Sequence, residues 1–139
     1  MFAHRNVLVV MDREWKSEDV KRLFGDYTTV TSVKTLGALR FHLSRGRYDA
    51  VLCGRAFRPG QWRKVLKTAA EASPSVPAIV LANNGNGQEW REAIQAGAFD
   101  LVTLPVEAHT LLGIVEQAVE SQQARSRYLE PAMLEAISA

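Results

Sequence analysis

The strongest constraint on the fold of this chain is a regular alternation of short apolar segments with amphipathic ones. Residues 6–11 are almost wholly apolar and rich in β-branched side chains, a pattern typical of a strand buried on both faces of a parallel sheet. Residues 17–24 then show apolar side chains at helical spacing behind a serine, and Gly25 ends that helix. This unit recurs four more times. The predicted strands are 6–11, 27–33, 49–53, 78–81 and 100–104, and the predicted helices are 17–24, 36–43, 61–72, 88–96 and one from about Glu107.

Composition limits the class of protein. A chain of 139 residues is long enough for one domain with a single sizeable core. Its 47% hydrophobic and 23% charged residues exclude a disordered chain. The lone Cys53 excludes a disulfide framework and a cysteine-rich metal site, and the apolar stretches are too short to span a bilayer. We therefore expect a cytoplasmic globular protein.

Five strand-helix units with short connections predict an α/β fold with a doubly wound, five-stranded parallel sheet and five flanking helices. Right-handed crossovers favour the flavodoxin-like strand order 2-1-3-4-5. In such folds ligands bind at the carboxyl ends of the strands. The residues at those ends are therefore the candidates for a functional site.

The stretches that follow this pattern resemble the receiver domain of bacterial two-component response regulators, from Asn6 to about Gln122. The resemblance implies a receiver-like domain over 1–121 and a helical C-terminal extension over 122–139. It also implies a CheY-like fold and a role in signal transduction. The stretches that carry it are VLVVMD (7–12), RYDAVLCG (47–54), PAIVLA (77–82) and AGAFDLVTLP (96–105).

The chemistry of that family requires five elements, and this sequence departs from each. Receivers have an acidic pair that binds Mg²⁺, an aspartate that accepts phosphate, a serine or threonine, an aromatic switch residue and a lysine. The corresponding positions here are Met11 and Asp12, Gly54, Ala82, Leu101 and Leu104.

These departures remove the phosphorylation chemistry for physical reasons. Gly54 has no carboxylate to act as the nucleophile. Asp12 alone, with Met11 in place of a second acid, provides too few oxygen ligands for Mg²⁺, which prefers octahedral coordination. We therefore expect a pseudo-receiver that is not an enzyme and that uses neither a metal nor a cofactor.

An apolar surface is the first candidate for function. In receivers the face formed by helix 4, strand 5 and helix 5 commonly mediates dimerisation and output, and here the resemblance places Trp90, Ile94, Leu101 and Ile114 on it. An exposed apolar patch around a tryptophan is typical of a protein interface. The alternative is that Trp90 folds back over the core of its own domain. The main functional hypothesis is a phosphorylation-independent module that binds a protein partner or forms a homodimer.

A cationic segment supports a second hypothesis. Arg55 and Arg58 follow Gly54 directly, and further basic residues continue into the next helix. They predict either a solvated helix face or an anion site for a nucleotide or another small ligand at the strand ends. No recognition motif or aromatic interleaving favours nucleic acid as a partner, and no segment favours a membrane.

Charge and the C-terminal tail are the remaining features. Residues 1–70 hold 14 basic and 6 acidic residues, a net charge of +8, whereas 71–139 hold 3 and 9, a net charge of −6. In the predicted order these halves form opposite edges of the sheet, which suits oriented docking, including head-to-tail self-association.

In the tail, 122–127 prolong the last helix, Pro131 is expected to interrupt it, and 132–139 place Met133, Leu134 and Ile137 on one helical face. We expect this tail to pack on its own domain as a cap, to serve as a dimerisation arm, or to be part of a linker to an output domain.

Overall fold

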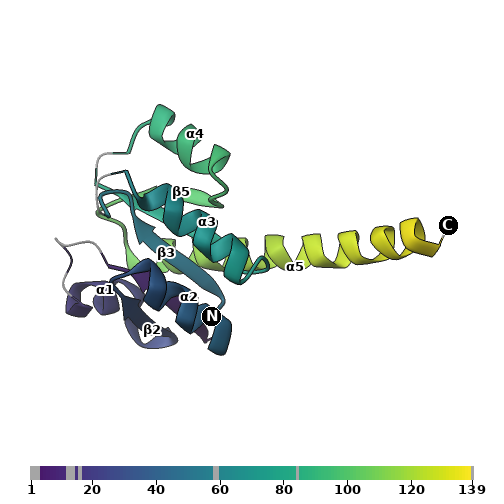
Figure 1. The fold of residues 1–139 in the computed structure, drawn as a ribbon. Coiled ribbons are helices and arrows are strands. Elements are labelled where there is room, and N and C mark those ends of the chain that lie inside the picture. The colour runs from purple at the N-terminus through teal and green to yellow at the C-terminus, as the bar shows by residue number, and fades with distance from the viewer. Residues whose placement is uncertain (1–3, 12–14, 16, 58–59, 84, 139) are drawn as a thin grey trace.

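The five strands form one parallel sheet in the order β2-β1-β3-β4-β5, which confirms the predicted flavodoxin-like topology (Figure 1). The computed structural model describes residues 4–11, 15, 17–57, 60–83 and 85–138. Val7 to Val10 of β1 are fully buried, because this strand lies inside the sheet, paired with β2 on one side and β3 on the other, and helices cover both faces. The strands are β1 (Arg5–Val10), β2 (Thr28–Val33), β3 (Ala50–Gly54), β4 (Ala78–Ala82) and β5 (Asp100–Thr103).

The helices begin and end close to their predicted bounds because local signals set them. Thr35 caps α2 by accepting a hydrogen bond from the Ala38 amide, and Asn86 caps α4 by accepting one from the Glu89 amide. Gly97 follows α4 with a φ of 104°, a backbone conformation that residues other than glycine rarely adopt. The helices are α1 (Ser17–Phe24), the 3₁₀ helix η1 (Gly25–Tyr27), α2 (Leu36–Arg45), α3 (Trp62–Ala72), α4 (Gly87–Gln95) and α5 (Ala108–Ser138).

Two apolar clusters cover the two faces of the sheet. Alternate residues of each strand point to opposite faces, so Leu8 and Val10 pack with α2, α3 and α4, whereas Val7 and Val9 pack with α1 and α5. The inner strands β1, β3 and β4 contribute to both clusters, which explains why they contain continuous apolar runs, whereas the edge strand β2 is rich in threonine.

The last helix is longer than the sequence predicts. Leu111, Val115 and Ala118 form its buried stripe, as expected. The expected interruption at Pro131 is wrong, because α5 continues to Ser138 and its second half projects away from the sheet (Figure 1). A proline inside a helix removes one hydrogen bond and its ring clashes with the carbonyl four residues earlier, which kinks some helices and ends others, and the local sequence does not distinguish the two outcomes. Within the described part of the chain, no helix combines the length and the apolar character that crossing a bilayer requires.

An ion-pair cluster fastens α5 to the edge of the sheet where the strands begin. Arg5 of β1 donates two hydrogen bonds to the Glu116 carboxylate, at 2.7 Å from Nε to Oε1 and 2.9 Å from Nη2 to Oε2. Its Nη1 also lies 3.6 Å from Oδ1 of Asp49. The Arg5 and Glu116 side chains are only 20% and 19% exposed, so this bidentate pair is partly shielded from water and salt.

We expect replacement of Glu116 by glutamine to destabilise the fold near pH 7 and to matter less as the pH falls. The hydrogen bond from Arg5 lowers the pKa of Glu116, against an opposing effect of burial and with a further lowering by the charge of Arg5. Because the folded pKa lies below the ordinary glutamate value of about 4.3, the stabilisation is complete above that value and is lost as the pH falls through the folded one.

Urea denaturation between pH 7 and pH 3 measures this effect. The expected loss for Glu116→Gln at pH 7 is about 1–2 kcal/mol. Glu120→Gln is the matched control, since Glu120 is exposed on the same helix. A difference between the Glu116 variant and the unmodified chain that stayed constant over this pH range would contradict the assignment.

Candidate functional site

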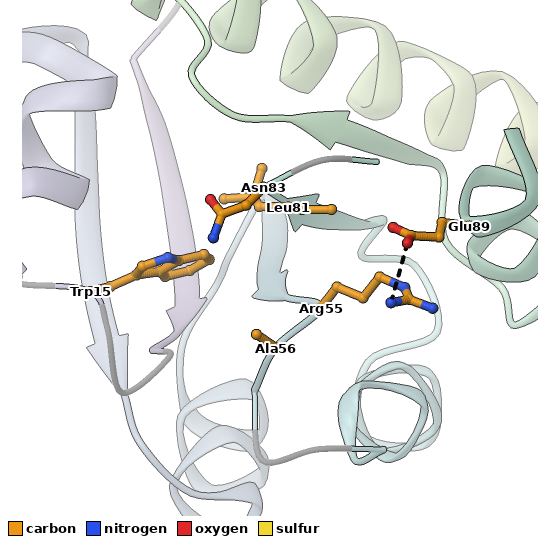
Figure 2. A pocket seen from close by; sticks show the side chains of 7 residues that line it. Trp15, Arg55, Ala56, Leu81, Asn83 and Glu89 are labelled. Atoms are coloured by element: carbon orange, nitrogen blue, oxygen red, sulfur yellow. Dashed lines mark ion pairs between the residues drawn. The ribbon is translucent and has the colours of Figure 1, made fainter. Parts of the chain in front are cut away.

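A small pocket lies where the carboxyl ends of β3 and β4 meet. Its volume is about 240 Å³. Figure 2 shows Trp15 on one side of it, Arg55 and Glu89 on the other, and Asn83 between them. The lining residues are Trp15, Arg55, Ala56, Leu81, Ala82, Asn83 and Glu89.

Backbone hydrogen bonds bring most of the predicted site positions together. Gly54 is the last residue of β3, and the next amide, that of Arg55, donates to the Leu81 carbonyl at 2.8 Å. The Leu104 amide donates to the Ala82 carbonyl, also at 2.8 Å. Gly54, Ala82 and Leu104 therefore lie on neighbouring strands at one edge of the sheet, which is the arrangement that the sequence predicts.

The remaining predicted positions differ in their surroundings. Met11 is buried, 6% exposed, directly after β1, and its amide donates to the Val33 carbonyl. Asp12 and Arg58 lie outside the described residues. Among the residues that the structure does describe, no group of three or more histidine, cysteine, aspartate or glutamate side chains is placed to hold a metal ion.

The guanidinium group of Arg55 contacts the carboxylates of two residues of α4, Glu89 and Glu92. Its Nη2 donates to Oε2 of Glu92 at 3.1 Å, and its Nη1 lies 3.7 Å from Oε1 of Glu89, the contact dashed in Figure 2. Arg63 of α3 approaches the same Glu92 oxygen at 3.6 Å. Both guanidinium groups also lie over the Trp62 ring, at 5.8 Å for Arg55 and 4.5 Å for Arg63.

This network changes the expected charge of the site. The sequence predicts a cationic strand-end pocket at Arg55, but two arginines face two glutamates there, so the charges of these four side chains balance. The buried Nε of Arg55 finds no partner among the described residues. The terminal nitrogens that an anion would need are already paired, which weakens the hypothesis of an anion site.

Glu89 and Glu92 are the site residues that the sequence did not reveal. They belong to a helix that is distant from Arg55 in the sequence, and acidic side chains near a helix N-terminus usually serve the helix itself. Their spacing of three residues places them on one side of α4. No local signal indicates that this side faces β3, so only the tertiary structure identifies the pairing.

The predicted apolar patch is smaller than expected. Trp90 is 45% exposed, and its indole Nε1 donates to Oδ1 of Asp100 at 3.0 Å. Ile94 and Ile114 are half-buried, and Ile114 packs with the cluster on the other face of the sheet.

The expectation that Leu101 shows on this surface is wrong. Leu101 is 8% exposed and belongs to the core cluster beneath α2, α3 and α4. The backbone of Gly85 lies directly over it, since a Cβ atom added at Gly85 would come within 2.6 Å of Cδ2 of Leu101. The loop before α4 therefore covers the side chain that the sequence places in the patch.

Comparison with solved structures finds the same fold in receiver domains. A CheY-like receiver domain protein from Methanospirillum hungatei has a TM-score of 0.72 and 16% identity, with 88% of this chain and 99% of that chain covered. The receiver domain of a sensor histidine kinase from Pseudomonas aeruginosa, with magnesium in its active site cleft, has a TM-score of 0.70 and 21% identity over 85% and 99% of the two chains. A chain carrying a fused trimeric coiled-coil segment of yeast Spc42 has a TM-score of 0.76 and 19% identity over 99% and 91%.

No family model matches the chain, and no curated protein matches it. At identities of 16–21% the structural likeness concerns the fold. The chain therefore has the fold of a CheY-like receiver domain, as the sequence resemblance implies.

We expect Arg55→Ala to loosen α4 without unfolding the domain. The change removes the contacts of Arg55 with Glu89 and Glu92, and partly exposed pairs of this kind contribute up to about 1 kcal/mol each. Amide hydrogens of 87–95 should therefore exchange faster, while those of β1 and β3 keep their protection. Arg40→Ala is the matched control, because it breaks an exposed pair with Glu71 that lies away from α4. Unchanged exchange in α4 would show that the network does not hold this helix.

Proposed function

We propose that this protein is a receiver-like signalling module that works without phosphorylation, by binding a protein partner or a second copy through the surface around Trp90. The observation that carries the proposal is the strand-end site, where Gly54 ends β3 and Arg55 reaches across to the carboxylates of α4. Such a site offers a structural contact where a receiver has its phosphate chemistry.

The residues of the site support the loss of that chemistry. An aspartyl phosphate requires a carboxylate nucleophile, and Gly54 has none. Ala82 brings no hydroxyl and Leu104 no ammonium group to the same edge of the sheet. A phosphoryl group at this position would have neither an attachment point nor the charge that stabilises it.

The Arg55 network supports a fixed arrangement of α4. In a molecule that switches, a ligand must interact differently with two conformations of the moving element. Here Glu92 of α4 contacts both Arg55, which follows β3, and Arg63 of α3. The proposal is therefore that α4 presents a constant shape to its partner.

The exposed indole supports the choice of surface. Trp90 and Phe41 are the two large apolar side chains that remain exposed among the described residues. The hydrogen bond from Trp90 to Asp100 orients the ring on the surface without burying it. Tryptophan is enriched among the residues that dominate binding energy in protein interfaces, because it combines a large apolar area with one polar group. Ile94 and Ile114 contribute only their partly exposed portions.

The competing role as an anion or nucleotide sensor has less support. Arg55 donates to Glu92 and lies beside Glu89, so an anion must displace a carboxylate before it can bind. We therefore retain protein binding as the function that this arrangement favours.

Beryllofluoride with Mg²⁺ is expected to leave the protein unchanged. Without a carboxylate at Gly54 the phosphoryl mimic has no ligand there, so the tryptophan fluorescence should not respond to titration. A receiver domain with all five chemical elements serves as the positive control. A saturable, Mg²⁺-dependent change in this protein would contradict a phosphorylation-independent function.

Trp90→Ala tests the proposed surface through two measurements. A half-exposed side chain loses little packing when truncated, so the variant should lose less than about 1.5 kcal/mol of stability, well below the 3–5 kcal/mol of a buried tryptophan. Trp90→Ala should also abolish partner binding. Arg91→Ala is the control and should retain it, since Arg91 is an exposed polar residue of the same helix. A stability loss of core size would show that Trp90 covers its own domain instead.

A further inference from the structure

A groove lies at the opposite edge of the sheet from the strand-end pocket, where β4 and β5 begin. It is bounded by the last turns of α3 and α4 and by the part of α5 that leaves the domain (Figure 1). Its volume is about 420 Å³. Ligand pockets in proteins typically measure about 300–1,000 Å³, so this groove is large enough for a small molecule.

Small side chains explain why this space is open. Ala69 of α3, Ala78 of β4 and Ala118 of α5 line the groove where their three elements meet. Larger apolar residues, among them Leu66 and Phe99, complete its walls. Protein cores are filled as densely as organic crystals, and alanine side chains are too short to fill the junction of several elements in that way.

The backbone around the groove already has hydrogen-bond partners. The Ala98 amide donates to the Ala93 carbonyl at 2.9 Å, which closes the end of α4. The Phe99 amide donates to the Ala78 carbonyl at 2.7 Å, which joins the starts of β4 and β5. Backbone groups that are paired in this way do not require water in the groove, so these walls favour an apolar occupant.

The polar side chains of the groove lie on one wall. Ser121, Gln122 and Arg125 of α5 are its three polar lining residues among those that the structure describes, and Arg125 is the charged one. Arg125 is exposed, and within the described part of the chain no carboxylate forms an ion pair with it. The positions three and four residues away from it on α5 are not acidic either. An apolar groove therefore has one unpaired cation at its side.

We propose that this groove binds a small carboxylic acid with an apolar body, of the class of the medium-chain fatty acids, in its ionised form. The hydrocarbon chain would lie against Leu66, Ile94 and Phe99. The carboxylate would accept hydrogen bonds from the guanidinium group of Arg125. At about 30 Å³ for each group of the size of a water molecule, the groove has space for about 14 such groups, which is enough for octanoate.

The charge and the walls of the groove favour this occupant over others. An apolar amine would place its ammonium group beside Arg125, and like charges repel. A nucleic acid needs several cations along its backbone, whereas Arg125 is the one charged residue that the groove offers. A peptide would bring amide groups against walls whose own backbone groups are already paired, so these amides would lose water without gaining partners. A hydrocarbon chain has no such groups to satisfy.

The test is a nuclear magnetic resonance titration of the full chain with sodium octanoate. Amide resonances of the residues that line the groove should shift and saturate, with a dissociation constant of about 5 mM or lower. Octanoate should bind about tenfold or more tightly than hexanoate, because each methylene group that leaves water strengthens binding about fourfold.

Arg125→Gln tests the contact with the carboxylate. It should weaken the binding of octanoate about tenfold, since a charge-assisted hydrogen bond is lost. The binding of octan-1-ol should change by less than about twofold, because the alcohol carries no charge. Arg91→Gln is the matched control, since Arg91 is exposed on α4 and does not line the groove.

Ala70→Phe tests the location of the site. Ala70 lines the groove and is exposed on α3, so a larger side chain there blocks the groove without entering the core. The variant should abolish the binding of octanoate and of octan-1-ol, and Ser121→Phe should do the same from the wall of α5. Ala124→Phe is the control, since Ala124 is exposed on α5 outside the groove. Far-ultraviolet circular dichroism confirms that each variant is folded.

The inference does not rest on the proposed function, because Trp90 is not among the residues that line the groove. Trp90→Ala should therefore leave the binding of octanoate unchanged, whatever it does to partner binding. Any of three results would overturn the inference: no saturable shift below about 20 mM octanoate, octylamine binding as tightly as octanoate, or binding that survives both groove-blocking variants. If Ala70→Phe abolished partner binding and octanoate did not bind, the groove would belong to the partner protein, which also contradicts the inference.

Discussion

The structure depends on a sheet whose two faces are both covered. Once five parallel strands are buried between helices, their backbone hydrogen bonds must be satisfied within the sheet, and every crossover must pass over one face or the other. The carboxyl ends of the strands then meet at one edge. Whatever side chains follow Gly54 and Ala82 are brought together there, whether or not they perform chemistry. The fold therefore decides where the residues at the strand ends meet, whatever the chemistry of their side chains.

Most of the fold could be predicted from the sequence because each element has a local signal. Continuous apolar runs such as Val7 to Val10 mark buried strands, and residues such as Thr35 and Gly97 mark the ends of helices. The strand order followed from the handedness of the crossovers. The error at Pro131 has a physical reason too, since a proline can kink a helix without ending it, and the sequence pattern is the same in both cases.

The candidate site was predictable in position but not in its contacts. The sequence places Gly54, Ala82 and Leu104 at one edge, and the structure agrees. It does not place Glu89 and Glu92 beside Arg55, because that pairing depends on how α4 is rotated against the sheet. Leu101 is a second example. Its side chain is buried because the loop at Gly85 lies against it, and the spacing of apolar residues along the sequence does not predict that contact. Contacts between elements are decided by packing, and packing is not encoded in spacing along one segment.

The length of α5 has a mechanical consequence. The ion pair of Arg5 with Glu116 and the buried side chains of Ala118 and Val119 hold the first part of this helix against the domain, as far as Gln122, whose side chain donates to the Pro74 carbonyl. From Gln122 to Ser138 the helix measures about 24 Å at 1.5 Å per residue, so a tilt of about 5° at Gln122 displaces its end by about 2 Å. A small change in the packing of α5 on the domain is therefore a larger displacement at the far end of the helix.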